Sequence, residues 1–476
     1  MDTSIVHGAA PGVLPARRLD AAGHAQVDLA AVVALALPLV ANSAVQTVLN
    51  LTDLWFIGHI STQAVAAVGA VNWLVLMVLL ALSGIGMAVQ TVAAQAYGGA
   101  RLARASQAVW TSLWGTLIAA PLFVLAGLGG RVLLARAGLA PDISALASQF
   151  WLPRVAGASI GAAMWGVLGF FNGIGQPRIT VLVTLLAALS NALFNALYIF
   201  GLGWGVAGSA WATNTAQVVG LAAALAVFLH SDFRRRYRSH LTFRPRAATL
   251  LQQLRLGLPM GLTYASDLLA ISLFLLMQVR LSTVDGAASQ IVMVVTSLAY
   301  MPGIGIALAG TTLVGQSIGA GSPAWAMRVG STVIACAALC MGGIGLALAL
   351  VGPWVLPLVV SASDPQAATV VARAAQLLWF AAAYQLFDGL NVGSGLCLRG
   401  AGDAAVPALL VLILALAFVP IAHALTFAPG AGWVEVIPQL GWGSNGGWLA
   451  VVVYISLLGL TLFARWRSAV WQRVHL

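Results

Sequence analysis

Four polar side chains interrupt an otherwise apolar stretch over residues 37–58. They are Asn42, Gln46, Asn50 and Asp53, spaced 4, 4 and 3 residues apart, so they fall on one side of an α-helix. A carboxylate in hydrocarbon costs about 3 kcal/mol or more, and Asp53 is therefore expected to face the protein interior or water. This makes Asp53 a candidate functional residue. The alternative is an aspartate near the outer helix end that reaches the headgroups or caps a neighbouring backbone.

Side chains with neutral oxygen atoms that could act as ligands lie on two later apolar segments of the first half. Asn191 and Asn195 are one helical turn apart, and Thr213 belongs to the next segment. If these segments pack beside Asp53, one formal charge meets several neutral oxygens. Such a set suits a hard monovalent cation such as Na⁺ at Asp53, Asn191 and Asn195, and equally a carboxylate that takes up and releases a proton. The alternative for the asparagine pair is hydrogen bonding between helices.

Two more carboxylates, Asp267 and Asp388, occupy similar apolar settings in the second half. Apolar surroundings favour the protonated form of a carboxylate, and a nearby like charge adds to this effect. The two residues are therefore predicted proton carriers, with a static hydrogen-bonding role as the alternative. The polar residues at one-turn spacings from Asp388 are Tyr384, Gln385 and Asn391.

Aromatic, methionine and polar side chains surround these two carboxylates along the sequence. They are predicted to line a cavity for a lipophilic cation. The alternative is that they only pack between helices or face lipid. The predicted substrate-cavity residues are Tyr264, Met260, Phe274, Tyr384, Gln385, Phe387 and Asn391.

The composition indicates a polytopic membrane protein. Of 476 residues, 61% are hydrophobic and 7% charged, and the mean hydropathy is +0.97, which leaves no polar shell for a soluble fold. The net charge of +10 comes from arginine, since lysine is absent. Nucleic acid is excluded as a partner, because the arginines sit in short segments between apolar runs. We interpret Cys336, Cys340 and Cys397 as small residues that pack in the core.

Apolar windows of about 20 residues predict twelve membrane-spanning helices. Seventeen arginines lie in intervals on one side and four, Arg131, Arg136, Arg280 and Arg373, on the other, which places both termini in the cytoplasm. Arg154 fits neither set and is expected to reach the membrane surface. The predicted helices are 30–57, 63–95, 104–128, 144–172, 176–201, 205–230, 249–281, 285–315, 326–351, 369–397, 403–427 and 446–464.

The two halves of the chain repeat. Residues 37–39 align with 258–260, and the same offset pairs Gln95 with Gln316 and Gly98 with Gly319. The six-plus-six arrangement predicts substrate sites between the repeats, near mid-membrane. The predicted division is a tail at 1–28, an N-terminal lobe at 29–230, a basic linker at 231–248, a C-terminal lobe at 249–464 and a second tail at 465–476.

Pro38 and Pro259 occupy equivalent positions in the two halves. Inside a helix each would free a backbone carbonyl and permit a bend that an alternating-access cycle could use. The alternative is that both mark the first turns of their helices, where proline is tolerated. His423 is the clearly intramembrane histidine and is interpreted as a packing or interface residue rather than a proton relay.

A series of short motifs follows one another within this repeat, at 38–58, 95–98, 172–177, 191–201, 256–259 and 398–403. In their order and spacing they resemble the multidrug and toxic compound extrusion (MATE) family of secondary transporters, over about residues 29–464. The resemblance implies two six-helix lobes that face each other in a V around a central cavity. It also implies antiport of bulky, often cationic drugs against Na⁺ or H⁺.

Site residues follow from the resemblance residue by residue. Asp53, Asn191, Asn195 and Thr213 match the cation or proton site of the first lobe, although some members carry Asp where this chain has Asn195. Asp267 and Asp388 resemble the acidic pair of the NorM-like branch, in which the seventh-helix residue is often Glu. These two departures leave the coupling ion open between Na⁺ and H⁺.

The sequence therefore predicts an all-α bacterial inner-membrane antiporter, not an enzyme, that exports amphipathic cationic drugs or dyes. We expect the protein to lie in the lipid bilayer, to need no cofactor and to function as a monomer. A flippase for lipid-linked precursors is the runner-up, but such sites hold inner-cavity arginines, which are scarce here. A membrane-embedded enzyme would need clustered catalytic groups at one membrane face, whereas these carboxylates are scattered over three helices.

Overall fold

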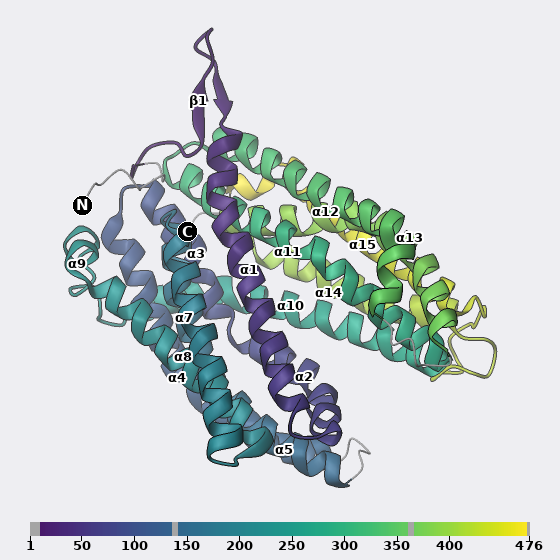
Figure 1. Ribbon diagram of the computed structural model, residues 1–476. Coiled ribbons are helices and arrows are strands. Elements are labelled where there is room, and N and C mark those ends of the chain that lie inside the picture. The colour runs from purple at the N-terminus through teal and green to yellow at the C-terminus, as the bar shows by residue number, and fades with distance from the viewer. Residues whose placement is uncertain (1–9, 136–140, 360–365, 474–476) are drawn as a thin grey trace.

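The protein is described by a computed structural model that covers residues 10–135, 141–359 and 366–473. The fold is almost entirely helical (Figure 1). The first half consists of α1 (Leu29–Gly58), α2 (Thr62–Leu82), α3 (Gly84–Gly98), α4 (Leu102–Ala135), α5 (Pro141–Ala156), α6 (Ala158–Gly173), α7 (Pro177–Asn195), the π-helix η1 (Ala196–Gly201) and α8 (Gly205–Leu229). A short helix, α9 (Ser231–Tyr237), lies in the predicted linker.

The second half has longer, unbroken helices. In the described residues, eleven helices are long and apolar enough to span a membrane, and a twelfth span forms if the bent pair α5 and α6 is counted as one. The prediction of twelve spans is thus confirmed with that pair included. The second-half elements are α10 (Ala247–Leu281), α11 (Thr283–Gly319), α12 (Pro323–Val359), α13 (Ala367–Ala401), α14 (Ala405–Thr426), α15 (Gly443–Arg467) and the 3₁₀-helix η2 (Val470–Arg473).

Two predicted helices are interrupted. The one expected over 63–95 breaks between α2 and α3 at Ser83, and the one expected over 144–172 bends by 41° between α5 and α6. At the second break the Asn214 side chain donates a hydrogen bond to the Pro153 carbonyl (2.7 Å), so a side chain of α8 satisfies a carbonyl beside the bend. Hydropathy alone does not distinguish a bent span from a straight one.

Both repeat-related prolines lie in helix interiors. Pro38 is within α1 and Pro259 is within α10, each well beyond the first turn. The first-turn alternative is therefore wrong. A proline at such a position removes one intrahelical hydrogen bond, and the role of the two residues in bending remains a prediction.

The N-terminal segment forms a β-hairpin beyond the start of α1. β1 (Arg17–Leu19) pairs antiparallel with β2 (Ala25–Val27), and the Trp325 indole donates to the Pro15 carbonyl (2.9 Å). The described ends of the chain and α9 lie at the same end of the molecule (Figure 1). We call this the terminal end. Arg136, one of the arginines used to assign the two sides of the membrane, lies outside the residues that the structure describes.

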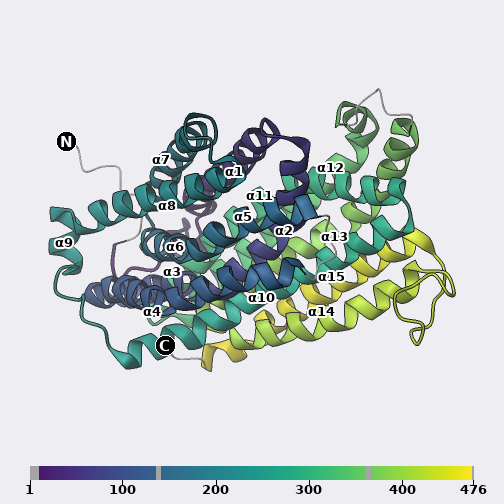
Figure 2. The same cartoon turned by 90° about the horizontal axis from the view of Figure 1, so that it is seen from below.

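The helices of the two halves form two lobes that diverge away from the terminal end (Figures 1 and 2). The largest hydrophobic cluster contains side chains of the second half, such as Phe274, Trp448 and Leu377. Two further clusters fill the first half, one around Phe170 and one around Trp151. Each lobe thus has its own core, as expected for a duplicated unit.

Where the lobes meet, side chains of one lobe bind backbone carbonyls of the other. The Gln95 amide on α3 donates to the Gly400 carbonyl (3.0 Å), and the Gln316 amide on α11 donates to the Gly173 carbonyl (2.9 Å). Gln95 corresponds to Gln316 in the repeat, and Gly173 corresponds to Gly400. The two hydrogen bonds are therefore equivalent under the pseudo-symmetry.

A second reciprocal pair repeats this pattern. Thr91 donates to the Arg399 carbonyl (3.0 Å), and Thr312 donates to the Asn172 carbonyl (3.0 Å). The donors are buried, and each such hydrogen bond contributes about 1 kcal/mol net. We call the contact formed by these four hydrogen bonds the seam.

Glycines allow the lobes to come this close. A Cβ placed on Gly98 would lie 1.9 Å from the Gln316 carbonyl oxygen, and one placed on Gly319 would lie 2.0 Å from the Gln95 carbonyl oxygen. These separations are far below van der Waals contact. Gly98 and Gly319 are equivalent in the repeat, so the same constraint acts from both sides of the seam.

The substitution Gly98→Ala is expected to destabilise the protein by about 2 kcal/mol, because the added methyl group has to push the seam apart. Thermal unfolding of the purified protein in detergent would show this as a lower midpoint. Gly343→Ala is the matched control, since a Cβ at this helical glycine meets nothing within 4 Å. Equal midpoints for the two variants would contradict the proposed tightness of the seam.

Candidate functional site

The four predicted first-lobe residues come together in one site. The Asn195 amide donates to Asp53 Oδ1 (2.7 Å), and the Thr213 hydroxyl lies 3.4 Å from Asp53 Oδ2. Asn191 completes the set, because its amide donates to the Thr213 hydroxyl (3.3 Å) and its own Oδ1 accepts from Asn195 (3.1 Å). One carboxylate is thus surrounded by amide and hydroxyl groups from α7 and α8.

The spacing of the sequence explains this geometry. Asn191 and Asn195 are one turn apart on α7, so both project from the same face towards α1. Thr213 on α8 reaches the same carboxylate because α8 packs against α7. Asn191, Asn195 and Thr213 are buried, and Asn195 Oδ1 has no hydrogen-bond partner among the described residues. This oxygen is available to a bound cation or a proton donor.

Other polar residues of these helices serve other contacts. Asn214, next to Thr213, turns to the Pro153 carbonyl rather than to Asp53. The Thr184 hydroxyl is buried without a partner in the described part of the chain. Tyr198 lies 3.4 Å from the Thr215 hydroxyl and contacts Trp204 at a ring separation of 5.0 Å.

The second lobe carries a pair of carboxylates on α10 and α13. Asp388 accepts a hydrogen bond from Asn391 (3.1 Å), the residue one turn later. Asp267 accepts a hydrogen bond from the Tyr454 hydroxyl on α15 (2.8 Å). The two carboxylates are close enough for their charges to act on each other. Each of these carboxyl groups thus accepts one side-chain hydrogen bond from a neutral donor among the described residues.

Sequence reasoning missed Tyr454 and assigned no role to Arg154. Nothing in the sequence indicates that the hydroxyl of Tyr454 meets Asp267, because that contact depends on how α15 packs against α10. Arg154 was expected to reach the membrane surface, and its Nη1 atom is buried without a hydrogen-bond partner in the described part of the chain. The residue as a whole is half-buried in the last turn of α5, so its reach to the membrane surface stays a prediction.

Several predicted cavity residues are packing residues. Phe274 is fully buried and meets Trp448 edge to face at 5.4 Å, and Met260 belongs to a hydrophobic cluster with side chains of the first half. These two assignments are wrong, since both side chains fill space between helices. Tyr384 stacks on Trp448 at 6.5 Å.

The other members of that set have mixed surroundings. The Gln385 amide donates to the Thr296 carbonyl (3.2 Å) and is buried, which ties α13 to α11. Asn391 contacts Asp388, as its spacing predicted. Phe387 is partly buried against the second-lobe core, and the predicted cavity role of Tyr264 and Phe387 stays a prediction.

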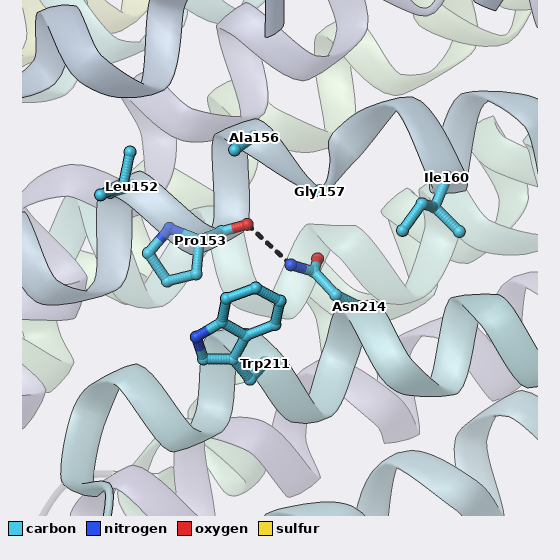
Figure 3. A pocket seen from close by; sticks show the side chains of 7 residues that line it. All are labelled: Leu152, Pro153, Ala156, Gly157, Ile160, Trp211 and Asn214. Carbon is cyan, nitrogen blue, oxygen red and sulfur yellow. Dashed lines mark hydrogen bonds between the residues drawn. The ribbon is translucent and has the colours of Figure 1, made fainter. Parts of the chain in front are cut away.

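A cavity of about 300 Å³ lies beside the bend between α5 and α6. Figure 3 shows its lining, with the hydrogen bond from Asn214 to the Pro153 carbonyl. The wall is mostly apolar and belongs to the first lobe. The lining residues are Leu152, Pro153, Ala156, Gly157, Ile160, Trp211 and Asn214.

His423 anchors a loop. Its Nε2 atom accepts hydrogen bonds from the backbone amides of Trp433 (2.9 Å) and Val434 (3.3 Å), which supports the interface interpretation. Within the described residues, the three cysteines are free thiols and no group of three or more His, Cys, Asp or Glu side chains has metal-binding geometry.

The two carboxylate sites share one chemical capacity. Each offers hard oxygen ligands inside apolar helices, so each can exchange a proton or hold a small monovalent cation. The first site has one carboxylate with neutral amides and a hydroxyl, whereas the second has two carboxylates with neutral donors. Neither arrangement contains an activated nucleophile.

Comparison with known proteins supports one family. A family model described as MatE matches residues 38–197 and 259–423. A protein of Agrobacterium fabrum named "Probable multidrug resistance protein NorM" is 28% identical over 91% of this chain and 92% of its own length. A protein of the same name from Pseudomonas aeruginosa is 32% identical over 93% of this chain and 90% of its own length.

Solved structures share the fold. One is a multidrug resistance MATE family transporter of the MOP superfamily in an outward-facing conformation, with a TM-score of 0.77 and 22% identity over 92% of this chain and 94% of the other. Another is a MATE protein in a straight conformation, with a TM-score of 0.77 and 20% identity over 92% and 95%. The all-α arrangement of two six-helix lobes is thus confirmed.

The substitution Tyr454→Phe is expected to destabilise the protein by about 2 kcal/mol at neutral pH, because Asp267 loses the donor that stabilises its charge. Thermal unfolding in detergent measures this change. Tyr198→Phe is the matched control, since its hydroxyl contact is long and neutral. The loss should be much smaller in an Asp267→Asn background, and an equal loss in both backgrounds would contradict the assigned contact.

Proposed function

The chain belongs to the MATE family of transporters, and from that premise we propose that it exports amphipathic, cationic compounds in exchange for Na⁺ or H⁺. It is a multi-pass membrane protein with up to twelve spans in its described residues. Members of this family are transporters, not enzymes. The relatives named as multidrug resistance proteins support small drugs or dyes as the substrates.

The observation that carries the proposal is the setting of Asp53. A carboxylate within a membrane-spanning helix meets Asn195 and Thr213 at hydrogen-bonding distances. An isolated charge there would be unfavourable, whereas a carboxylate that binds a cation or a proton is neutralised. The same reasoning applies to Asp267 and Asp388, whose charges oppose each other.

Competition for these carboxylates would couple the two fluxes. A coupling ion that enters from outside occupies Asp53 and the acidic pair and weakens their attraction for a cationic substrate, which leaves outward. The protein with neutralised carboxylates then returns to accept substrate from inside. A ligand shifts a conformational equilibrium only by its differential affinity for the two states, and charge neutralisation supplies that difference here.

The arrangement of the lobes supports an outward-open state. The seam joins the lobes, and the helices diverge away from the terminal end (Figure 1). The excess of arginine on the side of the termini argues for a cytoplasmic location of that end in a bacterial inner membrane. Alternating access would then require the seam hydrogen bonds to break. We take the functional unit to be a monomer, because each lobe carries its own carboxylate site.

Transport of a cationic dye into or out of vesicles, driven separately by an imposed Na⁺ gradient and an imposed pH gradient, tests this function. One of the two gradients is expected to drive transport, and Asp388→Asn and Asp53→Asn should each reduce it at least ten-fold, because a neutral amide cannot exchange charge. Membrane insertion of both variants, measured by expression and detergent extraction, should stay normal.

Asn50→Gln serves as a control, since Asn50 lies on α1 close to Asp53 in sequence but is exposed. Preserved transport in both aspartate variants would contradict the mechanism. If neither gradient moved any dye through the wild-type protein, the lipid-flippase alternative would replace the antiporter.

A further inference from the structure

The interior of the first lobe contains a positive charge that the proposed exchange does not use. Asp53 is the carboxylate within α1, and Arg154 lies in the last turn of α5. The Nη1 atom of Arg154 is buried and has no hydrogen-bond partner in the described part of the chain. A buried guanidinium nitrogen normally has a partner, so Nη1 of this half-buried side chain has unused hydrogen-bonding capacity.

Two adjacent residues of α8 connect Arg154 to Asp53. Thr213 lies 3.4 Å from the Asp53 carboxylate, and Asn214 donates to the carbonyl of Pro153, the residue before Arg154. Gly157 permits the contact, since a Cβ there would lie 2.1 Å from the Asn214 amide nitrogen. The bend of the α5–α6 pair and the carboxylate site are therefore fixed by the same turn of α8.

The two charges act on each other without direct contact. The contacts of Thr213 and Asn214 place both charged residues beside one turn of α8, within range of each other's charge, and no ion pair within 4.0 Å joins these two described residues. In contrast, Arg373 and Asp285 form an ion pair at 2.9 Å. The Asp53 oxygens remain with their amide and hydroxyl partners, and Arg154 influences them through space.

Few other ionisable groups surround Asp53. The helices packed against α1 are α2, α7, α8 and α11. Neither α2 nor α8 contains an ionisable residue, and the acidic residue of α11 is paired with Arg373. The ionisable residues of α7, η1 and α11 are Arg178, Tyr198, Asp285 and Tyr300, and His59 lies at the C-terminal end of α1 itself.

We propose that Arg154 is a built-in counter-cation that sets the affinity of the Asp53 site for the coupling ion. Its positive charge stabilises the empty, ionised carboxylate and disfavours a bound cation, whether Na⁺ or H⁺. The ion is then released on the inside instead of remaining bound. Arg154 is a positioning and tuning residue, because it does not contact the ion. This inference rests on the proposed function of the site.

The test compares Arg154→Gln with Arg154→Lys in the full-length protein. Removal of the charge is expected to lower the half-saturating concentration of the coupling ion about ten-fold, or to raise the pH of half-maximal rate by about one unit if the ion is H⁺. The maximal rate should fall, because the ion leaves more slowly. Arg154→Lys should keep values near those of the wild type.

A binding measurement separates this inference from the proposed function. The thermal midpoint of the protein in detergent is recorded as Na⁺ replaces choline, and separately as pH is lowered, since a ligand of the folded state raises it. Arg154→Gln should respond at about ten-fold lower ion concentration, and the Asp53→Asn background should remove the difference. Arg280→Gln, which removes a positive charge from an exposed position, should change nothing.

Three outcomes would overturn the proposal. They are an unchanged ion response in Arg154→Gln, an equal shift in Arg154→Lys, and a shift that persists in the Asp53→Asn background. Absence of ion-driven transport in the wild-type protein, with the ion-dependent midpoints intact, would instead count against the antiport function alone.

Discussion

The close approach of the two lobes at the seam is the constraint on which the rest of the architecture depends. Gln95, Gln316 and the two threonines bind backbone carbonyls across it, so each lobe recognises the main chain of the other rather than particular side chains. Such recognition requires backbones in contact, which is why Gly98 and Gly319 leave no room for a Cβ. Backbone carbonyls do not change when side chains diverge, and the contact can therefore persist while the interior of each lobe specialises.

That specialisation is visible at equivalent positions of the repeat. The position that holds Asp53 in the first half holds Phe274 in the second, and Phe274 is part of a packed aromatic cluster with Trp448. The equivalent of Asp388 is Gly161, which lies against the Gln217 side chain. A charge in one lobe thus corresponds to tight packing in the other. The duplicated scaffold carries two carboxylate sites that are not copies of each other.

Much of this could be predicted from the sequence. Hydropathy and arginine placement predicted the membrane-spanning helices. Spacings of one helical turn predicted that Asn391 lies beside Asp388 and Asn195 beside its neighbours in the site. Contacts between helices that are distant in sequence could not be predicted, since no local pattern encodes which faces meet. Tyr454 beside Asp267 is such a case. The assignments of Phe274 and Met260 failed because an aromatic or thioether side chain serves packing as readily as a cavity wall.

The two sites also differ in net charge. In the first lobe the charge of Asp53 is opposed by that of Arg154, whereas Asp267 and Asp388 repel each other and have Tyr454 and Asn391 as neutral donors. The buried Arg399 directs its guanidinium to the Met87 carbonyl across the seam (2.8 Å). Two uncompensated carboxylates attract a cation more strongly than one carboxylate with a nearby guanidinium. The second lobe therefore has the stronger electrostatic attraction for a cation, and the proposed competition between ion and substrate would have its main basis there.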